Sequence, residues 1–196
     1  MHFCVRIKAH GPLKRKTPIM NFDLKTLDLT AAASEKCDLL VVLIPEGFKP
    51  GADALSALAA LALKNGDLAL KAGKQLQLYQ VPAVAARRVV LVGGGDGSAR
   101  ALRQAVLAVG GAIKAPHTKR VVLCWAGAAS ADAVGAAVQA VAEASYVYTT
   151  TKSKAEARSL GRCVIGVTSP TEVREGFDRG VALVAGVEFA REWGNR

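Results

Sequence analysis

The chain contains few of the residues that disulfides, metal sites and membrane spans need. Its 196 residues include four cysteines with no C-x-x-C pair and three scattered histidines. Cys37, Cys124 and Cys163 lie in or beside apolar runs, which is typical of reduced thiols acting as small hydrophobic side chains. No apolar run approaches the roughly 18 residues of a membrane span, and no apolar signal segment follows the basic N-terminus. We therefore expect a cytoplasmic protein without membrane contact.

Several catalytic signatures are missing as well. The sequence has no H-E-x-x-H zinc motif and no G-x-S-x-G nucleophile turn, and its acids are spread singly. Aromatic residues make up only 5% of the chain, which weakens any base-stacking site for single-stranded nucleic acid. The chain is instead 51% hydrophobic with a mean hydropathy of +0.24, which is a globular composition.

Short apolar runs alternate with alanine-rich helical windows after Met20. The runs predict strands at residues 21–29 (ending in a bulge or turn), 38–44, 76–81, 88–92, 120–125 and 163–167. The windows predict helices at residues 52–63, 98–114, 131–146 and 170–193. Three of the strands are apolar on both faces, so helices must cover both sides of the sheet. We expect a three-layer α/β fold with a mostly parallel or mixed sheet, in which the alternating run 76–81 is an edge strand or half a hairpin.

The ends of the chain differ in character from its middle. Residues 1–19 carry five of the ten net positive charges, two glycine or proline breaks and no acid. We interpret them as a disordered basic leader or a vector-derived segment, with Met20 as an alternative start. Residues 20–168 form the expected α/β domain. Residues 169–196 form a long terminal helix, and its apolar stripe suggests that a further segment normally follows.

One glycine-rich turn is a candidate phosphate site. It follows an apolar strand and precedes a helix, where free amides and the helix dipole attract anions; its residues are Gly93, Gly94, Gly95, Asp96, Gly97 and Ser98. Ser98 stands where a dinucleotide fingerprint needs glycine, and no Lys-Ser or Lys-Thr follows. A tight strand-to-helix turn is the competing interpretation, and it is the one that we favour.

The net charge of +10 invites a search for a polyanion partner. Two basic clusters are candidates for contacts with the DNA backbone: Lys114, Lys119 and Arg120, and Lys152, Lys154, Arg158 and Arg162. Solvated loops are the simpler interpretation of both clusters.

The last helix carries a family resemblance. Residues 180–196, G-V-A-L-V-A-G-V-E-F-A-R-E-W-G-N-R, resemble the segment that joins the two domains of bacterial leucyl (cytosol) aminopeptidases. Three further stretches are similar and occur in the expected order: D-L-L-V-V-L-I after F-D-L-K, N-G-D-L-A-L-K-A-G-K, and E-A-S-Y-V-Y-T-T-T-K-S-K. The resemblance covers residues 20–196.

This resemblance implies a macro-domain-like N-terminal domain, detached from the catalytic domain that holds two metal ions, zinc or manganese. The family's metal ligands and its N-T-D-A-E-G-R-L signature have no counterpart here, so no catalytic or metal-binding residue is transferred and the chain alone is expected to be inactive. The parent family forms hexamers mainly through its catalytic domain, and some bacterial members bind DNA. The alternatives are a stand-alone module that binds ADP-ribose or another phosphate ligand and a DNA-binding accessory domain.

Overall fold

A computed structural model describes residues 20–148 and 157–194 of the chain. The predicted leader, residues 1–19, lies outside this range. The strands are β1 (Asn21–Thr26), β2 (Leu39–Pro45), β3 (Gln75–Tyr79), β4 (Arg88–Gly95), β5 (Arg120–Trp125) and β6 (Arg162–Val167). The helices are α1 (Leu29–Ser34), α2 (Ala54–Lys64), α3 (Ala99–Ala108), α4 (Gly110–Ile113), α5 (Ala131–Ser145) and α6 (Pro170–Gly194).

The strands form one sheet in the order β1-β6-β5-β2-β4-β3. All neighbouring pairs are parallel except β3 and β4, which are antiparallel. The predicted α/β class and mixed sheet are therefore confirmed, and the run around β3 is the edge strand that its alternating pattern predicted. In the central strand β2, Leu40 lies opposite Val89 of β4 on one side and Val122 of β5 on the other.

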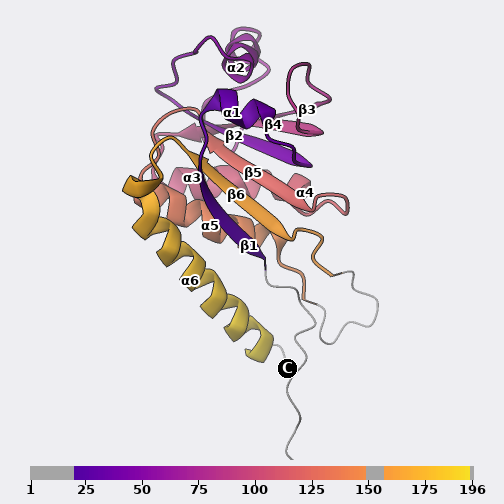
Figure 1. Cartoon of the computed structure of the whole chain (residues 1–196), viewed down its shortest axis with the longest axis vertical. Coiled ribbons are helices and arrows are strands. Elements are labelled where there is room, and N and C mark those ends of the chain that lie inside the picture. The colour runs from indigo at the N-terminus through magenta and orange to yellow at the C-terminus, as the bar shows by residue number, and fades with distance from the viewer. Residues whose placement is uncertain (1–19, 149–156, 195–196) are drawn as a thin grey trace, which may run out of the picture.

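Alternation along the strands divides the interior into two cores. Leu39, Val41 and Leu43 of β2 belong to the core beneath α3, α5 and α6, while Leu40 and Val42 belong to the core on the other face. Successive side chains of a strand point to opposite faces, so a continuous apolar run supplies both cores. Figure 1 shows the resulting layers, with α1 and α2 on one side of the sheet and α3, α5 and α6 on the other.

Side-chain caps fix where four helices begin. Asp28, Asp53, Ser98 and Ser130 are the N-cap residues of α1, α2, α3 and α5, and each accepts a hydrogen bond from the backbone amide three residues later. A capping oxygen satisfies an amide that has no partner within the helix. The same residues therefore end the preceding loops and set the positions of the helices on the sheet.

Helix α6 approaches α5 through glycines. A Cβ atom added at Gly176 would lie 1.9 Å from the carbonyl oxygen of Ala131, and one added at Gly180 would lie 3.0 Å from that of Gly135. The two backbones are therefore in contact over the first half of α6. Figure 1 shows the last turns of α6 extending beyond the sheet.

Two details differ from the sequence prediction. The expected helix over 98–114 is interrupted, because α3 ends at Ala108 and the short helix α4 begins at Gly110. Two adjacent glycines lower helix propensity at this point. The expected strand over 21–29 ends at Thr26, and Leu29 begins α1, because Asp28 caps a helix there. Within residues 20–148 and 157–194, no helix is both long and apolar enough to cross a bilayer.

Candidate functional site

The glycine-rich turn after β4 is closed by its own hydrogen bonds. The amides of Gly93 and Gly95 donate to Lys74 and Leu70, and the amide of Gly97 donates to Gly94. The Ser98 amide donates to the Asp96 carboxylate at 2.9 Å, and the bonds from Ser98 lower the pKa of Asp96. These amides are already used and an exposed carboxylate stands among them, which agrees with the tight-turn interpretation. Phosphate binding at this turn stays a prediction.

The predicted DNA-contact residues occupy different environments. Lys114 and Lys119 are exposed, whereas Arg158 is buried, and Lys152 and Lys154 lie outside the described residues. A buried arginine cannot reach a DNA backbone without rearrangement of the chain around it. DNA contact by these residues stays a prediction.

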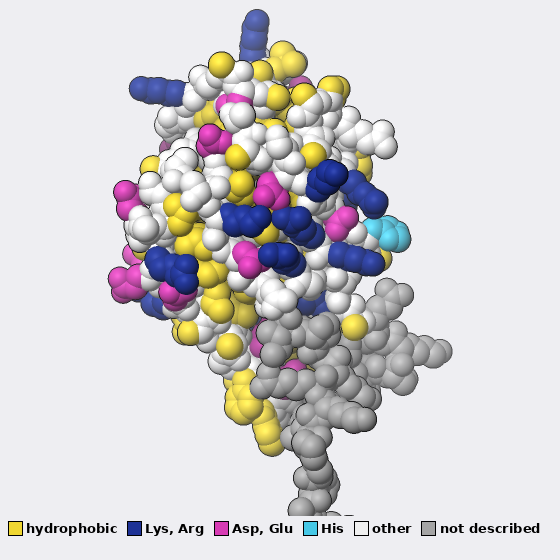
Figure 2. Space-filling view, in the orientation of Figure 1, with side chains coloured by type: hydrophobic (Ala, Val, Ile, Leu, Met, Phe, Trp, Pro, Cys, Tyr) yellow, Lys and Arg dark blue, Asp and Glu magenta, His cyan; other side chains and the backbone are white. Residues whose placement is uncertain are grey.

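Charged side chains of both signs interleave around the first residues of β5 and β6. Glu35 pairs with Arg120 at 2.7 Å and with Lys25 at 3.1 Å, and Arg162 pairs with Asp23 at 2.6 Å. The hydrogen bond that Arg162 donates to the Asp23 carboxylate raises the pKa of Arg162. Figure 2 shows Lys and Arg side chains gathered over the middle of the visible face, with Asp and Glu among them. Much of the basic charge in this region is therefore neutralised within the chain.

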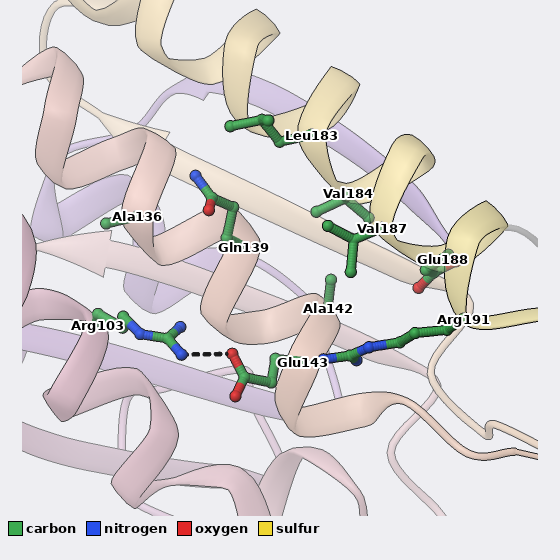
Figure 3. A pocket seen from close by; sticks show the side chains of 10 residues that line it. All are labelled: Arg103, Ala136, Gln139, Ala142, Glu143, Leu183, Val184, Val187, Glu188 and Arg191. Atoms are coloured by element: carbon green, nitrogen blue, oxygen red, sulfur yellow. Dashed lines mark ion pairs between the residues drawn. The ribbon is translucent and has the colours of Figure 1, made fainter. Parts of the chain in front are cut away.

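A groove of about 300 Å³ lies between the second half of α6 and helices α3 and α5. Its apolar wall includes Leu183, Val184 and Val187 of α6. On the opposite wall, Arg103 and Glu143 form an ion pair at 2.7 Å. Figure 3 shows this pair facing the α6 side chains across the groove.

Among the described residues, the outer part of α6 carries most of the large apolar side chains that are exposed to solvent. Leu183 and Val187 are each 47% exposed, Phe189 is 57% exposed and Trp193 is 55% exposed. The rings of Phe189 and Trp193 are 6.0 Å apart. Figure 2 shows hydrophobic side chains at the exposed lower end of the molecule, where Figure 1 places the last turns of α6. We call these four side chains the α6 apolar face. Clustered exposed apolar side chains typically mark an interaction surface.

Arg158 joins α6 to the end of α5. Its side chain is 1% exposed, its Nη2 pairs with the Glu188 carboxylate, and its Nε donates to the Ser145 carbonyl at 3.2 Å. Its guanidinium also lies 6.0 Å from the centre of the Tyr146 ring. On the other side, Arg158 lines a second pocket of about 300 Å³, which we call the Arg158 pocket.

The described residues offer neither an activated thiol nor a metal site. Burial raises the pKa of Cys37 to about 12 and also raises the pKa values of Cys124 and Cys163, so these thiols stay protonated at neutral pH. In the described ranges, no three His, Cys, Asp or Glu side chains lie close enough together to hold a metal ion. These residues therefore do not fit the two-metal centre that the resemblance implies for a parent enzyme, and we derive no catalytic step through it.

Sequence reasoning missed the groove and the role of Arg158. Arg103 and Glu143 lie on different helices, 40 positions apart in the sequence, and Arg158 is 30 positions from Glu188. Only the packing of α3, α5, α6 and the segment before β6 brings these residues together. The one signal in the sequence was the pair Gly176 and Gly180, whose four-residue spacing predicts a close helix contact.

Comparisons with known proteins point to one family. The family model described as "Cytosol aminopeptidase family, N-terminal domain" matches residues 41–155. The "Probable cytosol aminopeptidase" of Verminephrobacter eiseniae is 77% identical over 177 residues, which are 90% of this chain and 34% of the relative. A protein of the same name from Acidovorax sp. (strain JS42) is 56% identical, over 90% of this chain and 36% of its own length. The chain thus spans about a third of the length of these curated relatives.

Solved structures share the fold at low identity. A mutant of tomato leucine aminopeptidase matches 92% of this chain and 39% of its own with a TM-score of 0.68 and 19% identity. The bottromycin maturation enzyme BotP in complex with Mn matches 76% of this chain and 30% of its own with a TM-score of 0.53 and 18% identity. At such identities the match concerns the fold alone.

Proposed function

Because the chain belongs to the cytosol aminopeptidase family and corresponds to its N-terminal domain, we propose that it acts as the non-catalytic domain of an aminopeptidase. In this proposal the parent enzyme removes N-terminal residues from peptides, with chemistry supplied by the part of the polypeptide that this chain does not span. By the family resemblance, that part would hold two metal ions, which would supply Lewis-acid chemistry to the peptide and to water. The chain's own contribution is a folded domain with a surface for the catalytic part.

The α6 apolar face is the observation that carries this proposal. It consists of large side chains about half exposed on a single helix, and Phe189 and Trp193 lie on the side of α6 opposite the stripe that packs on α5. Burying a large apolar side chain stabilises a contact by about 1.5–3 kcal/mol. We therefore place the contact with the catalytic part on this face.

Further properties of the parent belong to the same proposal. The resemblance implies two zinc or manganese ions in the catalytic part, assembly into a homohexamer and, in some bacterial members, DNA binding. The relatives' name supports a cytosolic location. The exposed lysines Lys114 and Lys119 support backbone contact with DNA, and such contact weakens steeply as salt is raised. Sedimentation of the longer polypeptide and duplex binding at two salt concentrations test these points separately.

The decisive experiment compares the chain alone with a hybrid polypeptide. In the hybrid, this chain replaces the corresponding residues of the Verminephrobacter eiseniae relative, to which it is 77% identical. We expect the hybrid to hydrolyse a leucyl anilide with Mn²⁺ or Zn²⁺, and the isolated chain to show no turnover. Metal-dependent turnover by the isolated chain that survives repurification would contradict the proposal.

A matched pair of substitutions tests the surface. Phe189→Ser removes a side chain of the α6 apolar face that is 57% exposed, and Leu61→Gln changes a side chain of α2 that is 56% exposed on the other side of the sheet. We expect Phe189→Ser to lower the melting temperature and the activity of the hybrid, and Leu61→Gln to leave both unchanged. Equal effects of the two substitutions would argue against α6 as the contact surface.

A further inference from the structure

We propose that the Arg158 pocket binds a small organic anion through a phosphate or carboxylate group. The first observation is an unpartnered donor. Arg158 is almost fully buried, and its Nη1 is a buried atom with no hydrogen-bond acceptor among residues 20–148 and 157–194. A guanidinium cannot lose its charge in a protein, and leaving a buried donor of a charged group unpaired is costly. The site is therefore suited to an acceptor that carries negative charge.

The second observation is the charge of the pocket wall. Besides Arg158, the wall contains Lys114 at the C-terminal end of α4, and no described Asp or Glu lines the pocket. Glu188, the acid that pairs with Arg158, lines the groove between α6 and helices α3 and α5 instead. Buried Arg158 and exposed Lys114 both carry positive charge at the pocket, which favours an anionic ligand over a neutral or cationic one.

The remaining wall indicates a ligand larger than a bare ion. Ile113, Pro116 and Leu160 supply apolar surface, and the hydroxyl of Ser159 donates to the Ala115 carbonyl at 3.1 Å. A volume of about 300 Å³ is at the lower end of the range for small-molecule sites. The oxyanion would pair with exposed Lys114 and, after a local shift that uncovers the guanidinium, with Arg158, while a compact organic group would lie against the apolar wall.

Titration of the 196-residue chain tests this site. The probes are inorganic phosphate, phenyl phosphate and benzoate, each at an ionic strength held constant with chloride, and calorimetry measures binding. We expect saturable binding to one site per chain by at least one probe, with a phenyl-bearing anion binding more tightly than inorganic phosphate. Phenyl phosphate and benzoate distinguish a phosphate from a carboxylate ligand, and preference for either supports the site. Absence of saturable binding by all three would overturn it.

Substitution of two exposed lysines distinguishes binding in the Arg158 pocket from general attraction of anions to the surface. Lys114→Gln removes a charge from the pocket wall, and Lys119→Gln removes a charge from an exposed lysine that does not line it. We expect Lys114→Gln to weaken binding about tenfold, as for loss of one charge-assisted contact, and Lys119→Gln to leave it unchanged. Equal weakening by both would mean non-specific attraction and would overturn the proposal. Both lysines are exposed, so the test does not depend on a substitution of buried Arg158.

Discussion

The two halves of α6 have opposite relations to the rest of the molecule. In the first half, Val173 and Phe177 enter the core, and the backbone at Gly176 touches α5. In the second half, Phe189 and Trp193 are exposed to solvent. The spacing of 3.6 residues per turn puts Val173 and Phe177 on one side of α6 and Phe189 and Trp193 on the other. The difference teaches that the regular stripe predicts the face that this chain buries, and that large apolar side chains away from the stripe form a second, exposed surface.

The first test of this contrast places one methyl group between α6 and α5. In Gly176→Ala the new Cβ would lie 1.9 Å from the Ala131 carbonyl oxygen, so the helices must separate. We expect the free energy of unfolding to fall by about 3 kcal/mol, the upper end of the cost of overpacking. Urea unfolding followed by circular dichroism measures this loss. An unchanged midpoint would show that the two backbones are not in contact.

The second test removes the ion pair that links the second half of α6 to Arg158. Glu188→Gln leaves buried Arg158 with a neutral partner. Because hydrogen bonds between charged groups are stronger than neutral ones, we expect a loss of about 2 kcal/mol in the free energy of unfolding. Glu175→Gln, at an exposed position in the first half of α6, is the control and should have almost no effect. Equal losses for the two variants would show that the ion pair of Glu188 with Arg158 contributes no more to stability than an exposed glutamate does.

The third test repeats the first substitution in the second half. A Cβ added at Gly186 meets no atom within 4 Å. Alanine favours a helix over glycine by about 0.8–1 kcal/mol, so Gly186→Ala should stabilise the chain by up to about that amount. The same chemical change thus has opposite signs at Gly176 and Gly186. Thermal melts of the two variants side by side would show this, and destabilisation at both positions would remove the contrast.

The smallest effect is expected at Phe189. Its ring is exposed in the isolated chain, so Phe189→Ser should change the free energy of unfolding by less than about 0.5 kcal/mol. The measurement is urea unfolding of the isolated variant. A large loss of stability here would mean that the second half of α6 already packs within this chain, and the α6 apolar face would then be an internal contact.

The sheet could be predicted from the sequence because its central strands are apolar on both faces, as only a sheet between two helical layers requires. Helix α1 was missed because it has only six residues, too few for a periodic pattern, and Asp28 was its sole signal. The break at Gly110 was missed because the apolar pattern continues through it.

The candidate sites were harder to predict than the fold. Arg158 belonged to a cluster of basic residues that resembled a solvated loop, yet its side chain is buried. Its burial depends on Glu188 and on the Ser145 carbonyl, which only the tertiary fold brings to it. Charge is visible in a sequence, but the solvent exposure of that charge is a property of the packed structure.

The contrast within α6 also has a spectroscopic consequence. The chain has two tryptophans: Trp125 is 5% exposed in the core, and Trp193 is 55% exposed near the end of α6. An indole emits at shorter wavelength in an apolar environment than in water, so the native spectrum should contain a blue component from Trp125 and a red one from Trp193. Covering the second half of α6 would shift only the red component, while unfolding would shift the blue one. Fluorescence can therefore follow docking and unfolding separately, without any added dye.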